Sequence, residues 1–225
     1  MKLLRRLLSL SLIRMSSSFS SSSSTSTHTL AHPTLGLILG ALSKPTNTIQ
    51  YRGLPYARVP GRFRDPILVN SLTHLHTSAP FDGTKWGHIA IQQLDAEEMD
   101  AKILNTPVLS VGKERKEMDE LRCANLVVTT PDSERGKKLP VIVWAHGGAY
   151  KVGSANFAAY DTVNIVRHSV EIGMPVVVIS INRRLNSLGS TATPELGRST
   201  ESGNWLLKDE KCALEWVCCP LPEGG

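Results

Sequence analysis

A histidine, two glycines and an alanine follow directly on an apolar run, in the stretch "LPVIVWAHGGAY" at residues 139–150. Acyl transfer passes through a tetrahedral intermediate whose oxygen carries negative charge, and preorganised N–H donors stabilise that oxygen. Backbone donors reach a substrate only where side chains do not obstruct the approach, which favours glycine. The spacing predicts an oxyanion hole at Gly147, Gly148 and Ala149, and the alternative is an ordinary Gly-Gly turn.

Strand-like and helix-like segments alternate in the second half of the chain, where they would position this loop. Unbroken apolar runs predict strands buried on both faces of a sheet at 139–146 and 174–184, and a β-branched run predicts another at 123–131. Two short strands are predicted earlier, at 34–42 and 47–52, and helical spacing is found at 95–104, 113–122, 156–173 and 203–217. This order predicts an α/β fold with a mostly parallel sheet and crossover helices.

The amino-terminal segment differs in composition from the rest of the chain. Residues 1–28 are rich in arginine, leucine and serine and contain no acidic residue. Such a composition fits a mitochondrial transit peptide, a secretory signal or a disordered tail, and its apolar stretches are too short to span a bilayer. We therefore expect one folded domain at 29–225 and no stable membrane span.

Charge and cysteine usage narrow the class of partner and the compartment. The net charge of +5 includes four basic residues of the amino-terminal segment, Lys2, Arg5, Arg6 and Arg14. The remainder is near neutral and poor in aromatic residues, which argues against nucleic-acid binding. The four cysteines show neither C-x-x-C nor zinc-ligand spacing, so we expect no metal, no cofactor and an intracellular location, cytoplasmic or mitochondrial, rather than secretion.

Five segments in a fixed order resemble the type-B carboxylesterase and lipase family, which includes the cholinesterases and has the α/β-hydrolase fold. They are "YRGLPYARVPGRFRDP", "CANLVVTTP", "LPVIVWAHGGAYKVGS", "VVVISINRRLNSLGS" and "GNWLLKDEKCALEWV", together within residues 34–217. The resemblance implies a serine-esterase mechanism acting on a small-molecule carboxylic ester. It also implies that the chain is the amino-terminal part of an α/β-hydrolase fold.

The resemblance assigns roles to particular residues. Gly147, Gly148 and Ala149 match the oxyanion loop, with the N–H groups of Gly148 and Ala149 as donors. Three further residues match framework positions of the family: Asn182, Arg183 and Asp209. On this match Arg184 stands one place beyond the family's arginine. Cys123 matches a cysteine that secreted members pair with an earlier one, and here it has no upstream partner.

The family's nucleophile motif G-x-S-x-G is not found in the chain. Ser187 and Ser199 each match only half of it, and His168 has the character of a surface residue. His74, His76 and His88 lie in a region without a catalytic role in the family. The match stops before the nucleophile elbow, so we expect a truncated chain that lacks the serine, the acid and the histidine of the triad and is inactive alone. The alternative is a non-catalytic, cholinesterase-like binding module.

Overall fold

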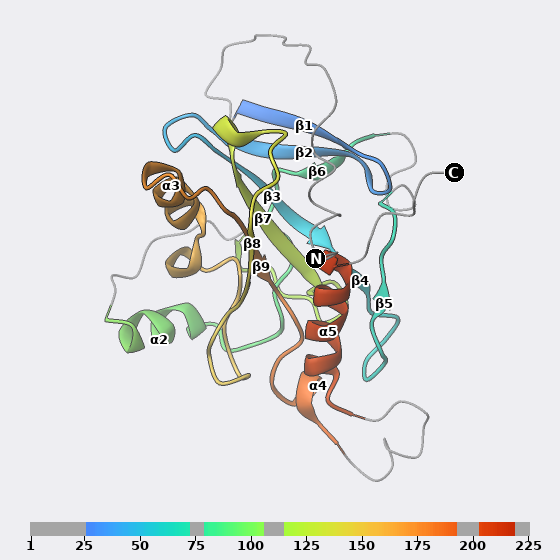
Figure 1. The fold of residues 1–225 in the computed structure, drawn as a ribbon. Helices are drawn as coiled ribbons and strands as arrows, with labels where there is room; N and C mark the ends of the chain where they lie inside the picture. Colours follow the sequence, from blue (N-terminus) through green and yellow to red (C-terminus); the bar gives the residue numbers. More distant parts are fainter. Residues whose placement is uncertain (1–25, 73–78, 106–114, 193–202, 219–225) are drawn as a thin grey trace.

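A single mixed sheet forms the centre of the computed structural model, which describes residues 26–72, 79–105, 115–192 and 203–218 (Figure 1). Its strand order is β1–β2–β3–β7–β9–β8, with β6 beside β2. The bounds are β1 Ser26–His32, β2 Gly36–Ser43, β3 Thr48–Pro55, β6 Phe81–Gly83, β7 Asn125–Pro131, β8 Val141–Ala145 and β9 Val177–Ile181. A separate two-stranded ribbon pairs β4 (Ala57–Arg58) with β5 (Ile67–Leu68).

Strand direction divides this sheet into two parts. The ladders from β1 through β2, β3 and β7 to β9 are antiparallel, whereas β8 pairs parallel with β9 and β6 parallel with β2. The parallel pair β8–β9 is joined through helix α3 (Val163–Glu171), which forms the strand–helix–strand unit that the sequence predicts. The α/β class is thereby confirmed, and among the described strands only the pairs β8–β9 and β6–β2 have the parallel direction that we expected for most of the sheet.

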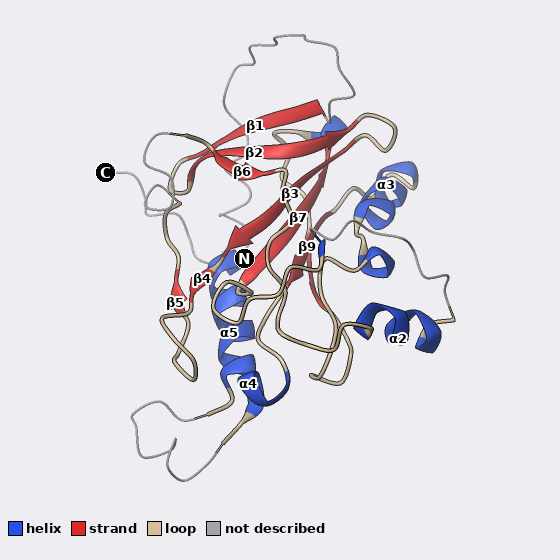
Figure 2. Cartoon of the chain, turned by 180° about the vertical axis from the view of Figure 1, so that it is seen from behind, coloured by secondary structure: helices blue, strands red, loops and turns tan. Residues whose placement is uncertain are grey.

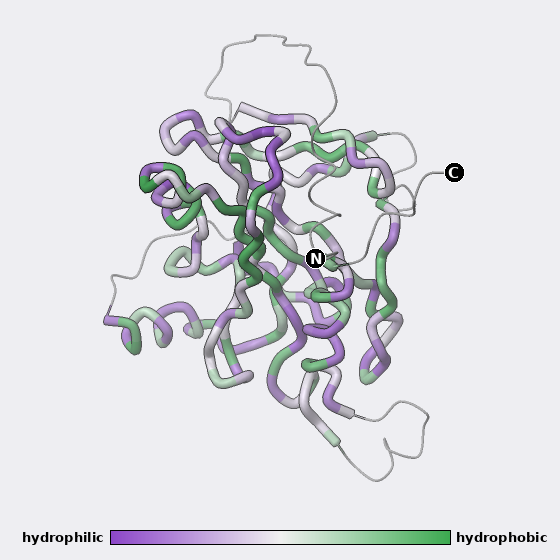
Figure 3. Tube along the Cα trace, viewed as in Figure 1, coloured by the Kyte–Doolittle hydropathy of each residue, from purple (hydrophilic) through white to green (hydrophobic). Residues whose placement is uncertain are grey.

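Helices cover both faces of the sheet. Helix α3 packs over β3, β7 and β9 on one face, while α5 (Trp205–Cys218) covers the other (Figure 2). Because side chains alternate along β7, Leu126 and Val128 join the core beneath α5. The hydropathy colouring of Figure 3 shows the same concentration of apolar residues along the central strands. The other helical segments within the described residues are α2 (Ala96–Ile103), α4 (Asn186–Ser190) and the short turns η2 (Asp132–Glu134) and η3 (Ala158–Tyr160).

A fully buried ion pair fastens α5 to the end of β9. The Asp209 carboxylate accepts hydrogen bonds from Arg184 Nη2 at 2.6 Å, from Arg184 Nε at 2.9 Å and from the Arg184 amide at 3.0 Å. Arg184 Nη1 also donates to the Arg64 carbonyl at 2.8 Å. Arg184 is thus the partner of Asp209, while the adjacent Arg183 lies 2.8 Å from the Glu210 carboxylate.

The strand that leads into the predicted oxyanion loop is not buried on both faces. Ile142 and Trp144 are 45% and 43% exposed, because β8 is the outermost strand on its side of the described sheet. The companion strand β9 is buried at every position, as the sequence predicts. An apolar composition thus identifies β8 as a strand but not its place at the edge.

Two predicted helices differ from the structure. The described part of the predicted helix 113–122 is not α-helical, because Ile89 forms a bridge to Met118 and the Asp119 carboxylate accepts the amides of Leu121 and Arg122. The predicted helix 156–173 is shorter, since α3 begins only at Val163 after the turn η3.

Strand β1 starts at Ser26, three residues before the expected start of the domain at residue 29. Of the amino-terminal segment 1–28, residues 1–25 lie outside the described residues. Within the described ranges, no helix combines the length and the apolar character needed to cross a bilayer.

Candidate functional site

The segment after β8 turns sharply and has a left-handed backbone at several positions. The φ angles are +98° at Gly148, +53° at Ala149, +60° at Tyr150 and +114° at Gly153. A side chain at φ > 0 is strained by about 1–3 kcal/mol, so Ala149 and Tyr150 hold this conformation only because their surroundings impose it. We call residues 146–153 the glycine loop.

Two glycines of the glycine loop are required by close contacts. A Cβ atom at Gly148 would lie 2.1 Å from the carbonyl oxygen of Val152, and one at Gly153 would lie 2.3 Å from Nδ1 of His146. The Gly148 carbonyl accepts the amides of Lys151 and Val152 at 3.0 and 3.1 Å, which closes the turn. At Gly147, in contrast, a Cβ atom would meet nothing within 4 Å.

Distant parts of the chain hold the glycine loop in place. Gln92 binds Gly153 at two points, since its Oε1 accepts the Gly153 amide at 2.7 Å and its Nε2 donates to the Gly153 carbonyl at 3.0 Å. The Arg183 guanidinium donates to the His146 carbonyl at 3.0 Å, and the backbone N–H of Asn186 donates to the Tyr150 carbonyl at 2.7 Å. The loop is thus fixed at its beginning, middle and end.

Asn182, which follows β9, connects the far end of the loop to the sheet. Its Oδ1 accepts the Ser154 hydroxyl at 3.0 Å and the Ala155 amide at 2.8 Å. Its Nδ2 donates to the side chains of Asn125 at 3.2 Å and Asn156 at 3.1 Å. All of these groups are buried, so Asn182 has the framework role that the sequence comparison implies.

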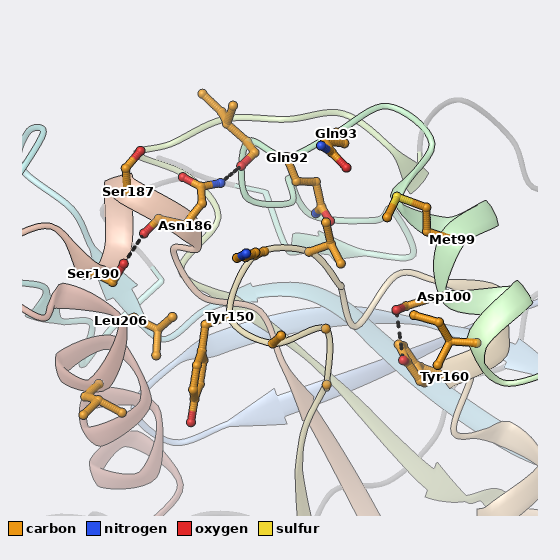
Figure 4. A pocket seen from close by; sticks show the side chains of 18 of the residues that line it. Gln92, Gln93, Met99, Asp100, Tyr150, Tyr160, Asn186, Ser187, Ser190 and Leu206 are labelled. Carbon is orange, nitrogen blue, oxygen red and sulfur yellow. Dashed lines mark hydrogen bonds between the residues drawn. The ribbon is translucent and has the colours of Figure 1, made fainter.

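The amide N–H groups of Gly148 and Ala149 donate to no other group in the described parts of the chain. Both residues line a pocket of about 1570 Å³ that also contacts α2, α4 and α5 (Figure 4). Unsatisfied backbone N–H groups need an acceptor. In this pocket the acceptor can be water or an oxygen of a bound ligand.

A buried cation that is paired with a carboxylate lies beneath the glycine loop. Arg183 is buried behind the loop, and its Nε lies 2.8 Å from the Glu210 carboxylate of α5. Burial, followed by the charge of Arg183, lowers the pKa of His146 to about 3, so this imidazole is neutral at pH 7. Its Nδ1 donates to the Gly147 carbonyl at 2.9 Å.

The buried His146 predicts a loss of stability in acid. Unfolding restores the ordinary pKa of 6.5, so between pH 6.5 and 3 the unfolded chain binds one proton more than the folded chain. The free energy of unfolding should therefore fall by about 1.4 kcal/mol for each pH unit below 6.5. Urea unfolding at pH 7, 6 and 5 measures this slope. His146→Asn, whose amide can still donate to Gly147, should flatten it.

The exposed His168 on α3 provides the matched control, because its replacement by asparagine should leave the slope unchanged. Equal slopes for the wild-type chain and His146→Asn would show that His146 is not the group that titrates.

The structure places the other sequence candidates as follows. Ser187, a half-match to the nucleophile motif, lines the pocket from the first turn of α4, but no histidine is among the described lining residues. His88 lies 3.6 Å from the Glu117 carboxylate, away from the pocket. Ser199, His74 and His76 lie outside the described residues.

Sequence reasoning missed the residues that reach the site from far along the chain. Gln92 belongs to an irregular polar segment, and no local pattern indicates that it binds Gly153. Asp100 and Tyr160, which also line the pocket, lie 60 positions apart and are hydrogen-bonded to each other at 2.9 Å. The helical period at 95–104 predicts α2 but not which of its acids faces the pocket.

Comparison with known proteins gives relatives among fungal lipases. Lipase 1 of Yarrowia lipolytica is 30% identical over 177 residues, which cover 78% of this chain and 33% of the relative. A protein of Arthroderma benhamiae named as a secreted lipase is 30% identical over 171 residues, covering 74% of this chain and 27% of the relative. This second relative is named as secreted, which contradicts the intracellular location that we expected. The expectation was wrong because the missing partner of Cys123 concerns one disulfide and does not determine the compartment.

Solved structures and a family profile agree with these relatives. A PNB esterase structure superposes with a TM-score of 0.65 at 24% identity, covering 84% of this chain and 34% of that one. The chain spans about a third of the length of the proteins that it matches. The profile described as "Carboxylesterase family" matches residues 25–219. The chain belongs to the carboxylesterase family.

Proposed function

We propose that this chain provides the oxyanion hole of a carboxylic-ester hydrolase, with the N–H groups of Gly148 and Ala149 as the donors and Gly147 as the open approach. The observation that carries the proposal is that these two amides have no described acceptor and line a pocket. Donors of this kind stabilise a developing oxyanion by about 2.7–4 kcal/mol each when tested by removal.

The electrostatics of the loop support the binding of a negative oxygen. The buried guanidinium of Arg183 donates to the carbonyl of His146, and residues 146–153 contain no acidic side chain that would compete with a bound anion. The residues that line the pocket come from α2 on one side of the glycine loop and from α4 and α5 on the other (Figure 4). The two sides offer separate room for the acyl and the alcohol part of an ester.

The nucleophile of this reaction has no candidate among the described lining residues. Ser190 donates its hydroxyl to the Asn186 carbonyl at 2.7 Å, and Ser187 has no histidine beside it in the pocket. The reaction therefore needs a serine, an acid and a histidine beyond these residues. The alternative of a non-catalytic binding module has no better support than the hydrolase proposal.

Gly147→Val tests the approach to the donors without disturbing the turn. Position 147 is free of left-handed φ and of contacts within 4 Å, so the free energy of unfolding should change by less than about 0.5 kcal/mol. Calorimetry on the full chain would compare ethyl butylphosphonate, a stable tetrahedral anion, with its planar isostere ethyl pentanoate. The phosphonate should bind the wild-type chain at least about tenfold more tightly. Gly147→Val should remove that preference.

Gly173→Ala serves as a control, because Gly173 lies after α3 and outside the pocket. This variant should keep the preference for the phosphonate. Equal affinity of the wild-type chain for the anion and the neutral ester would overturn the proposal.

A further inference from the structure

The side chain of Gln92 connects the wall of the pocket to the end of the glycine loop. Its Oε1 accepts the Gly153 N–H at 2.7 Å, and its Nε2 donates to the carbonyls of Gly153 at 3.0 Å and of Ala90 at 3.2 Å. Exchanging the oxygen and the nitrogen of this amide would place Oε1 against two carbonyl oxygens, so a single orientation satisfies all three groups. Among the described residues, no other side chain binds both the N–H and the carbonyl of one residue of the loop.

The backbone that carries Gln92 is held by a distant segment. The N–H of Ile89 donates to the Glu117 carbonyl at 2.8 Å, and the Ile89 carbonyl accepts the Asp119 N–H at 3.0 Å. Ile89 and Ala90 are both buried. The amide of Gln92 therefore projects from a fixed base, and its position is set outside the glycine loop that it binds.

Contacts of Gly153 restrict the peptide group that contains the Gly148 N–H. This N–H belongs to the same planar unit as the Gly147 carbonyl, and in a trans peptide the two point in opposite directions. A Cβ atom at Gly153 would lie 2.7 Å from the Gly147 carbonyl oxygen and 2.3 Å from His146 Nδ1, which itself donates to that oxygen at 2.9 Å. The backbone of Gly153 thus packs against the Gly147 carbonyl and, through it, restricts the direction of the Gly148 N–H.

The second donor is fixed through the residue before Gly153. The Ala149 N–H shares its peptide plane with the Gly148 carbonyl, which accepts the N–H groups of Lys151 and Val152 at 3.0 and 3.1 Å. Val152 is bonded directly to Gly153, so a displacement of Gly153 moves this hydrogen bond. Both donors therefore depend on the position of Gly153.

We propose that Gln92 is a positioning residue of the oxyanion hole: by holding Gly153 it directs the two donor N–H groups into the pocket. The inference rests on the proposed function, because it explains how the donors of that function are held in direction. Ala149 and Tyr150 have left-handed φ angles of +53° and +60°, so the loop needs such an external hold. Gln92 acts through Gly153 and not by contact with the reacting oxygen.

Gln92→Glu tests this role, because the introduced carboxyl matches the amide only when it is protonated. The neutral carboxyl keeps one acceptor and one donor, whereas the carboxylate has no donor and meets the carbonyls of Gly153 and Ala90. Calorimetry would measure the binding of ethyl butylphosphonate, a monoanion throughout, at pH 5 and pH 8. The ratio of the variant's affinity to that of the wild-type chain should fall at least about fivefold from pH 5 to pH 8. Gln92→Met, which has no amide, should bind the phosphonate at least about fivefold more weakly than the wild-type chain at both pH values.

Gln93→Glu is the matched control for the added charge. Gln93 is the next residue on the same wall of the pocket (Figure 4), and its side chain forms no hydrogen bond among the described residues. Its affinity ratio should change less than about twofold over the same pH range, because an exposed carboxyl is largely ionised at both pH values. Equal pH dependence in the two glutamate variants would show that charge alone acts, and it would overturn the inference.

Amide NMR of ¹⁵N-labelled Gln92→Glu without ligand gives a second measurement. The signals of the two donor amides should shift with the same titration midpoint as the Gly153 signal, while that of Gly173 stays unmoved. Burial lowers the pKa of His146 to about 3, so this ring does not titrate between pH 5 and pH 8. A Gly153 shift that leaves both donor amides unmoved would overturn the inference. Loss of the wild-type preference for the phosphonate over the ester overturns only the proposed function, because the ligand-free shifts decide the role of Gln92 by themselves.

Discussion

Replacing Asp209 by asparagine should lower the free energy of unfolding by about 3–5 kcal/mol, the usual cost of removing one partner from a buried ion pair. The variant leaves the Arg184 guanidinium, which is 1% exposed, without its counter-charge. It also weakens the connection between α5 and the segment after β9, which carries Arg183 and Asn182, the residues that contact the two ends of the glycine loop. Urea unfolding followed by the fluorescence of the buried Trp205 and Trp216 measures the effect.

Glu215→Gln gives the matched control on the same helix. Glu215 and Lys211 form an exposed pair at 3.6 Å, so its loss should cost less than about 0.5 kcal/mol. The double variant Arg184→Met with Asp209→Leu should recover much of the stability lost in Asp209→Asn, because it removes both buried charges. A cost below about 1 kcal/mol for Asp209→Asn would contradict the role that we assign to the pair.

Gly148→Ala should destabilise the chain by about 3 kcal/mol and abolish the preference for the phosphonate over the ester. The added methyl would combine a left-handed φ of +98° with a 2.1 Å approach to the Val152 carbonyl oxygen. Relief of this clash must move either the turn or the Gly148 amide, and both changes disturb the donors. Urea unfolding and phosphonate calorimetry on the same preparation separate the two effects.

Gly173→Ala isolates the cost of the backbone angle from the cost of the contact. Gly173 has φ +73° with no atom within 4 Å of an added Cβ, so its replacement should cost only about 1–2 kcal/mol. Binding of the phosphonate should be unaffected in this variant. Equal destabilisation by the two substitutions would show that the Val152 contact does not constrain the glycine loop.

Local patterns in the sequence were sufficient for the main elements and for the glycine loop. The β-branched and apolar runs predict β7, β8 and β9, and the helical spacing after residue 203 predicts α5. The left-handed angles at Gly148 and Gly153 explain why glycine stands at these positions. In these elements the residue type and its immediate neighbours indicate the local structure, whereas the left-handed angles of Ala149 and Tyr150 depend on the distant residues that hold the glycine loop.

Properties that depend on distant neighbours could not be predicted. The exposure of Ile142 and Trp144 depends on what lies beside β8, which the composition of the strand does not contain. Which of the two adjacent arginines pairs with Asp209 depends on how α5 packs against the end of β9, 25 positions away in the sequence. The contact of Asp100 with Tyr160 and that of Gln92 with Gly153 join segments without any shared pattern.

The central claim is that Gly148 and Ala149 hold two N–H groups ready for a negative oxygen. Titration of the ¹⁵N-labelled chain with ethyl butylphosphonate, followed by amide NMR, tests it most directly. The account predicts saturable downfield proton shifts at the amides of Gly148 and Ala149, with the dissociation constant found by calorimetry and no shift at Gly173. Saturation of binding with both amides unmoved would contradict the account.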